Sequence, residues 1–162
     1  MEDFVLFKTF PSGGTVSLMT GLDKTSSDYN ELLSIACCFA RTGKNVKVLA
    51  PVHYKDPQYR RVFGALIGTR YERKCPDLII DGNYYEYESY VRPWTKRKTS
   101  NMITNGLRQS DRIILDNREK ASSRWLSRSI RARLKINAPI KEVWAFEVMW
   151  TKTVGDSDKS GW

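Results

Sequence analysis

The sequence predicts an α/β fold in which helices flank a mixed central β-sheet. Short runs of β-forming residues alternate with segments of helical periodicity, the pattern of strands and helices packed in layers. A length of 162 residues and a hydrophobic content of 41% suit one globular domain with a buried core. We expect residues 1–155 to form that domain, with an N-terminal hairpin in 1–27, a core in 28–150 and a flexible tail in 156–162.

The first third of the chain is expected to form the N-terminal β-hairpin, a helix and a strand. Residues 4–10 and 15–19 are rich in β-formers and enclose a Pro-Ser-Gly-Gly turn, which predicts the hairpin. A D-x-x-E capping box at residues 28–31 opens a helix with apolar side chains at helical spacing, and Gly43 terminates it. Residues 46–50 then form a short strand that ends before a proline.

The central segment contains a hairpin rich in acidic residues. Residues 59–67 fit a short helix, and residues 78–80 and 84–89 have the composition of two strands. Asp81-Gly82 or Gly82-Asn83 makes the turn between those strands.

The last third alternates helices and strands. Helical spacing predicts a helix over residues 100–110 and another over 120–135, whereas 112–116 and 142–150 have the composition of strands. The core order is therefore helix, three strands, helix and strand, with one further helix and strand.

The chain is strongly basic, with 27 Lys and Arg against 18 Asp and Glu and a net charge of +9. Such an excess attracts polyanions, of which nucleic acid is the commonest. A merely solvated basic surface is the alternative. No apolar run is long enough to span a bilayer, and the acidic N-terminus lacks the features of a secretory signal. We therefore expect a freestanding cytoplasmic protein with no membrane partner.

Cysteine and histidine usage excludes several kinds of site. Cys37, Cys38 and Cys75 lack CxxC spacing, which argues against a disulfide framework and a structural zinc site and fits a reducing compartment. His53 is the one histidine of the sequence, so two-histidine nuclease chemistry is excluded. A Ser-His-Asp triad has no supporting nucleophile motif.

The helix predicted over residues 120–135 carries a basic stripe. Its four cations recur at steps of four, three and four residues and so share one face: Arg124, Arg128, Arg131 and Lys135. Leu126, Ile130 and Leu134 lie on the opposite side and should face the core. Like charges on one stripe repel unless a partner or solvent screens them, so this face either binds phosphates or is simply solvated.

A second basic cluster follows the acidic hairpin and consists of Arg92, Lys96, Arg97 and Lys98. Tyr90 and Trp94 are interleaved with these cations and either stack on unpaired bases or pack in the core. Together the two clusters predict a surface that follows a phosphate backbone.

The carboxylates of the acidic hairpin are Asp77, Asp81, Glu86 and Glu88. Glu86 and Glu88 are two residues apart and share one face of their strand, whereas Asp77 starts the partner strand. Asp81 falls near the turn. Oxygen ligands at this spacing suit Mg²⁺ or Mn²⁺, which would activate water and stabilise charge on a scissile phosphate. The alternative is a charged edge strand whose carboxylates only prevent aggregation.

With these motifs in their order, the sequence resembles a known family. Pro76-Asp77 followed by Glu86-x-Glu88, in helix–strand–strand–strand–helix–strand order, resembles the PD-(D/E)xK nuclease superfamily. More narrowly, residues 28–148 are similar to the C-terminal tRNA-nuclease domains of contact-dependent growth-inhibition toxins. The stretches that carry this similarity are 30–31, 41–46, 49–51, 76–82, 113–116 and 140–143.

The resemblance implies a restriction-endonuclease-like core and a metal-dependent nuclease whose substrate is tRNA or other RNA rather than DNA. It implies that Asp77 and Glu86 bind Mg²⁺ or Mn²⁺ and that Glu31, on the first helix, adds a ligand or a water contact. Glu31 fits equally well as the acid of its capping box. A toxin domain would also need an acidic immunity protein as its partner.

The chain departs from the family pattern at the third catalytic position, where Glu88 replaces the expected lysine. Some restriction enzymes of the superfamily have E-x-E, with that acid proposed as the general base. One hypothesis is therefore a nuclease with the catalytic residues Asp77, Glu86 and Glu88. The alternatives are a catalytically inactive nucleic-acid-binding module and a protein-interaction module of the same fold.

Overall fold

The computed structural model describes residues 2–90, 92–117, 122–147 and 150–153. It contains two compact units, Met1–Tyr84 and Tyr85–Trp162. The single domain expected over residues 1–155 stays a prediction, and the expected tail at 156–162 lies outside the described residues.

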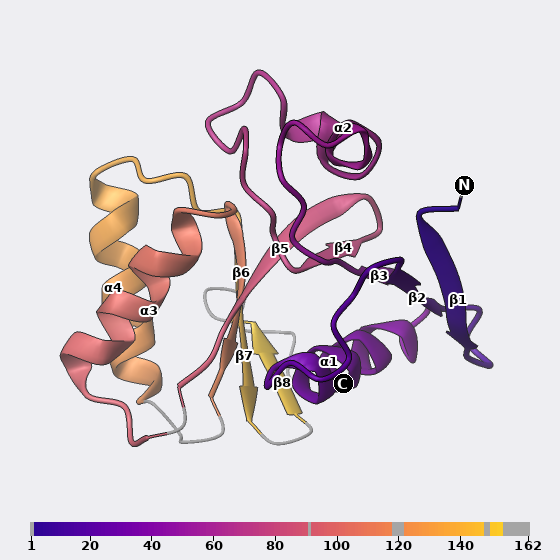
Figure 1. The fold of residues 1–162 in the computed structure, drawn as a ribbon. Coiled ribbons are helices and arrows are strands. Elements are labelled where there is room, and N and C mark those ends of the chain that lie inside the picture. The colour runs from indigo at the N-terminus through magenta and orange to yellow at the C-terminus, as the bar shows by residue number, and fades with distance from the viewer. Residues whose placement is uncertain (1, 91, 118–121, 148–149, 154–162) are drawn as a thin grey trace. The chain divides into compact units, whose positions relative to one another are not determined.

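The first unit contains a mixed sheet in which the strands lie side by side in the order of the sequence (Figure 1). The first two strands pair antiparallel, the next pair is parallel, and the last pair is antiparallel. The parallel pair is joined through a crossover helix, as parallel pairing requires. The elements of this unit are β1 (Phe4–Thr9), β2 (Thr15–Met19), α1 (Tyr29–Ala40), β3 (Asn45–Val48), α2 (Pro57–Phe63), the 3-10 helix η1 (Gly64–Leu66) and β4 (Leu78–Ile80).

A hydrophobic cluster in the first unit joins the α2 segment to the sheet. Tyr59, Val62 and Phe63 of α2 are buried there, together with Met19 at the end of β2. The hydroxyl of Tyr84 donates a hydrogen bond to the Val62 carbonyl at 2.6 Å. Buried apolar contacts therefore anchor the α2 segment, which lies between β3 and β4 in the sequence.

The second unit alternates parallel strands with helices. β5, β6 and β7 pair in parallel and in sequence order, and β8 is antiparallel to β7. The boundary between the two units falls inside β5, after Tyr84. The elements are β5 (Asn83–Glu88), α3 (Lys96–Leu107), β6 (Arg112–Asp116), α4 (Ser123–Lys135), β7 (Glu142–Glu147) and β8 (Trp150–Thr153).

The core of the second unit lies between its two helices and one face of its sheet. Alternate residues of β6 and β7 point to the helices, as the two-residue repeat of a strand requires. Figure 1 shows α3 and α4 side by side against β6 and β7. The buried side chains of this cluster include Met102, Ile103, Ile113, Leu115, Leu126, Ile130, Val143 and Ala145.

The structure confirms the predicted α/β class and the mixed sheet, and it corrects three details. α3 begins at Lys96 rather than Ser100, because the Thr95 hydroxyl accepts a hydrogen bond from the Lys98 N–H and caps the helix earlier. The strand expected over residues 142–150 is instead divided between β7 and β8. Leu134 is 51% exposed and not part of the core.

Candidate nucleic-acid interface

The predicted phosphate-binding cations of the second unit are almost all exposed on or next to its two helices. We call the following residues the α3–α4 basic surface: Arg92, Lys96, Arg97, Arg124, Arg128, Arg131 and Lys135, each of which is exposed. Neither helix contains an Asp or Glu residue. No carboxylate on these helices therefore neutralises the surface, and its field extends into solvent.

The amphipathic pattern of α4 explains why its stripe of cations is exposed. Leu126 and Ile130 are buried against the sheet, one helical turn apart. Arg124, Arg128 and Arg131 lie on the other side of the helix and reach solvent. The spacing that predicted the stripe is therefore realised, and the exposed cations can contact a polyanion.

Arg133 has a different role from the rest of the α4 cations, and this role was not predicted from the sequence. Its guanidinium donates hydrogen bonds to the Ser100 carbonyl at 2.7 Å, to the Ser129 carbonyl at 2.9 Å and to the Thr104 hydroxyl. Burial lowers the pKa of Arg133, although the group stays charged at neutral pH. The signal in the sequence was its spacing: Arg133 lies three residues after Ile130, on the apolar side.

The start of α3 shows that the aromatic residues there have structural roles. Trp94 is 6% exposed in the core, and its indole N–H donates to the Tyr90 carbonyl at 3.4 Å. Lys98 lies 4.0 Å from the Tyr90 ring centroid and covers that ring. Of the two alternatives for Trp94, stacking on unpaired bases is therefore wrong, because the ring is inside the core.

Most of the net charge is in the second unit. Residues 85–162 contain 16 Lys and Arg against 9 Asp and Glu, a net charge of +7, whereas residues 1–84 contain 11 against 9, a net charge of +2. The unit with the α3–α4 basic surface therefore carries the larger excess of positive charge.

Glu86 and Glu88 lie on the face of the second unit's sheet that its helices cover. They pair in register with Ile113 and Leu115, which belong to the core beneath α3 and α4. Glu88 also packs against α3, since its Cγ lies 3.4 Å from the position that a Cβ would have on Gly106. Both carboxylates are half-buried, and Oε2 of Glu86 is shielded from solvent.

The other two predicted ligands belong to the first unit. Asp77 comes directly before β4, and its carbonyl accepts a hydrogen bond from the Leu49 N–H at 2.9 Å. Glu31 lies in the first turn of α1 with Oε2 shielded from solvent. The Asp28 side chain makes no capping hydrogen bond, so the Asp28 half of the expected capping box is not formed.

Metal binding by these carboxylates stays a prediction. Glu31 and Asp77 lie in one unit and Glu86 and Glu88 in the other. Across the residues that the structure describes, no group of three or more His, Cys, Asp or Glu side chains is arranged to hold a metal ion. Asp81 belongs to the turn, as expected, where its carboxylate accepts a hydrogen bond from the Asn45 N–H at 2.9 Å and pairs with Lys44.

The tyrosine–carboxylate pairs of the second unit were not predicted from the sequence. The Tyr87 hydroxyl donates to Asp116 at 2.9 Å, and the Tyr85 hydroxyl donates to Glu142 at 2.6 Å. Asp116 is 5% exposed at the end of β6. In the sequence, Tyr85 and Tyr87 alternate with Glu86 and Glu88 along β5. This alternation indicates that the opposite face of the strand also carries polar groups, the two tyrosine hydroxyls.

Comparison with known proteins gave no match to any family model, curated protein or solved structure. Within the part of the chain that the structure describes, no helix has the length and apolar character needed to cross a membrane.

Proposed function

We propose that this protein binds nucleic acid, with RNA favoured, through the α3–α4 basic surface. The observation that carries the proposal is the exposed stripe of Arg124, Arg128 and Arg131 on a helix without carboxylates, packed beside a second such helix. Cations held in a row on a helix without carboxylates repel one another, and a phosphate backbone removes that repulsion.

Binding of labelled RNA, followed by fluorescence anisotropy over a range of salt concentrations, tests this function. Neutralising several phosphates releases counterions, so the affinity should fall steeply between about 50 and 200 mM salt. Absence of binding at low salt would contradict the proposal. Co-purification with an acidic protein, without any nucleic-acid binding, would instead favour a protein-interaction module such as a toxin domain with its immunity partner.

A second candidate function is metal-dependent hydrolysis of phosphodiester bonds. Its supporting observation is that Glu86 and Glu88 are half-buried on one face of β5, in the unit that carries the basic surface. In this proposal Asp77 and Glu86 bind Mg²⁺ or Mn²⁺, Glu31 contributes a ligand or a water contact, and Glu88 is the general base. A bound metal ion would activate water and stabilise charge on the scissile phosphate.

Asp77→Asn and Glu86→Gln should each reduce Mg²⁺-dependent RNA cleavage at least about a hundredfold while RNA binding persists. Glu88→Gln should have a similar effect, because it removes the proposed base. Glu72→Gln is the matched control, since Glu72 is exposed in the α2 segment and outside the predicted site. Cleavage is measured on a gel with and without EDTA, and thermal unfolding checks that each variant is folded.

The wild-type protein decides between the two candidate functions. Binding without cleavage in either Mg²⁺ or Mn²⁺ would leave the nucleic-acid-binding module and reject the nuclease. Cleavage that survives both Asp77→Asn and Glu86→Gln would reject these residues as the catalytic site.

A further inference from the structure

We propose that the first unit contains a second nucleic-acid contact, which binds unpaired bases. It consists of five exposed side chains from two loops, and we call it the Tyr54 patch: His53, Tyr54, Lys55, Arg70 and Arg73. The inference rests on the proposed nucleic-acid function and adds to it the kind of nucleic acid that is bound.

The centre of the Tyr54 patch is a stack of planar groups. The Arg73 guanidinium carbon lies 4.2 Å from the Tyr54 ring centroid. The His53 ring lies 4.8 Å from the Tyr54 ring with a tilt of 31°. Tyr54 is 39% exposed, so part of the stack is accessible at the protein surface. Unpaired bases stack on aromatic rings and on arginine planes of this kind.

The two loops of the Tyr54 patch are held together by contacts beneath it. The Cys75 thiol donates to the Val52 carbonyl at 3.3 Å, which joins the end of one loop to the start of the other. The Tyr59 hydroxyl donates to the Lys74 carbonyl at 2.9 Å, and Tyr59 is 2% exposed. The stack is therefore built before a ligand arrives, which lowers the entropic cost of binding.

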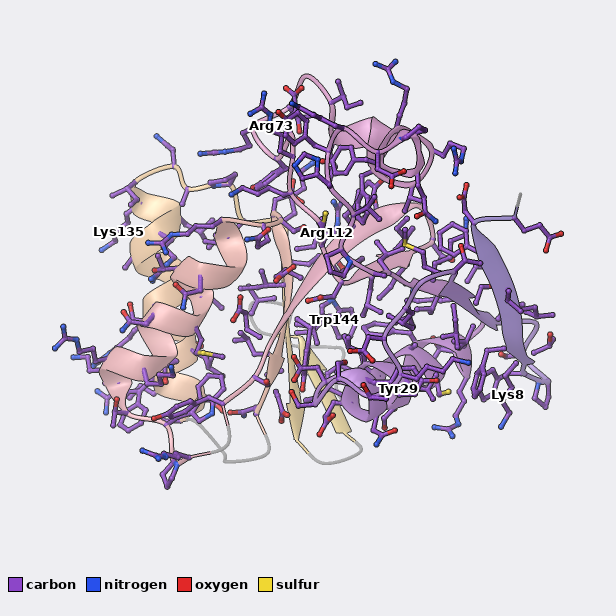
Figure 2. All side chains as sticks on the ribbon, in the orientation of Figure 1. Lys8, Tyr29, Arg73, Arg112, Lys135 and Trp144 are labelled. Atoms are coloured by element: carbon purple, nitrogen blue, oxygen red, sulfur yellow. The ribbon has the colours of Figure 1, made fainter. Side chains whose placement is uncertain are left out.

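The backbone of Arg73 adds a second line of support. Its φ angle is +72°, in the left-handed region where a residue with a Cβ is disfavoured and glycine is not. Strained backbone of this kind is concentrated at binding sites. Arg73 carries its guanidinium onto the Tyr54 ring from this conformation, and Figure 2 labels Arg73 on the loop beyond α2.

Charge around the Tyr54 patch also favours a polyanion. Residues 53–74 contain 6 Lys and Arg residues and 2 carboxylates, Asp56 and Glu72. Asp56 is engaged as the N-cap of α2, where it accepts a hydrogen bond from the Gln58 N–H at 2.9 Å. Arg61 is paired with Asp3 at 3.0 Å, whereas Lys55, Arg60, Arg70 and Arg73 are exposed.

Tyr54→Ala tests the inference in the full-length protein. It should weaken binding of a labelled single-stranded RNA by about tenfold, whereas Tyr54→Phe, which keeps the ring, should bind as the wild type does. Single-stranded DNA of the same sequence shows whether the patch binds unpaired bases of RNA only or also those of DNA. Tyr54→Ala should lose little affinity for a duplex RNA, whose bases are already stacked on one another.

Arg73→Gly separates a role in binding from a structural role. Glycine relieves the left-handed strain, so the melting temperature should stay the same or rise while single-strand affinity falls.

Equal loss of duplex and single-strand affinity in Tyr54→Ala would overturn base stacking. An unchanged affinity of Tyr54→Ala for single-stranded RNA would overturn it too. If the wild type binds no nucleic acid at all, the proposed function fails. If the wild type binds and Tyr54→Ala binds equally well, only this inference fails.

Discussion

Gly106 shows how a single position sets the distance between α3 and the sheet of the second unit. A Cβ on Gly106 would lie 2.7 Å from Cγ2 and 3.3 Å from Cβ of Ile113, closer than side chains pack. Ile113 is fully buried, so it has little freedom to move away. The glycine therefore permits the close approach that brings α3 over Glu88 and β6.

Gly106→Ala should destabilise the protein by about 1–3 kcal/mol, because overpacking outweighs the helix propensity that alanine adds. Gly64→Ala is the control, since the nearest atom to its new Cβ is Arg60 Cγ at 4.0 Å and its φ is −58°. That variant should be as stable as the wild type or slightly more stable. Urea denaturation measures both, and a fully stable Gly106→Ala would contradict the packing described for α3.

At the scale of the element, α4 uses its cations in two ways according to the face on which they lie. Arg131 is exposed, whereas Arg133 joins α4 to α3 through hydrogen bonds to Ser100 and Thr104. The two arginines are only two residues apart, but a helix rotates about 200° over that distance. Identical residue types therefore have a structural role and a surface role on the same helix.

Arg133→Gln should lower the free energy of unfolding by about 1–2 kcal/mol, because half-buried acceptors on α3 lose their donor. Arg131→Gln should leave stability within about 0.5 kcal/mol of the wild type and weaken RNA binding instead. Thermal unfolding and anisotropy on both variants measure the contrast. Equal effects of the two substitutions on stability would refute the division of roles on α4.

Local patterns of the sequence were sufficient to predict most of the elements. Turn residues and periodicity act over a few residues. They predict the N-terminal hairpin, the strand at Arg112–Asp116 and the amphipathic helices. The start of α3 was missed because the Thr95 cap lies ahead of Met102, the first buried apolar residue of the helix. The exposure of Leu134 was missed because Arg133, not Leu134, reaches toward α3.

The candidate site could be predicted less completely. Exposure of the α4 stripe follows from helical spacing alone, so the sequence was informative there. The geometry of Glu31, Asp77, Glu86 and Glu88 depends on contacts between residues far apart in the chain, and no local pattern contains it. The Tyr54 patch combines two loops about 20 residues apart, which explains why periodicity gave no sign of it.

At the scale of the whole molecule, the charge is unevenly distributed between the two units. The second unit has a net charge of +7 and the first has +2. Electrostatic attraction to nucleic acid should therefore depend mainly on the second unit, and base stacking should depend on the Tyr54 patch of the first. Salt weakens the electrostatic part much more than the stacking part.

The most direct test of the central claim is the slope of log affinity for RNA against log salt concentration. It is compared between the wild type and the triple variant Arg124→Gln, Arg128→Gln, Arg131→Gln. Each lost phosphate contact should reduce the steepness of this slope by about 0.7–0.9, so the triple variant should differ by about 2–3. The same slope in both proteins, with both folded, would contradict phosphate binding by the α3–α4 basic surface.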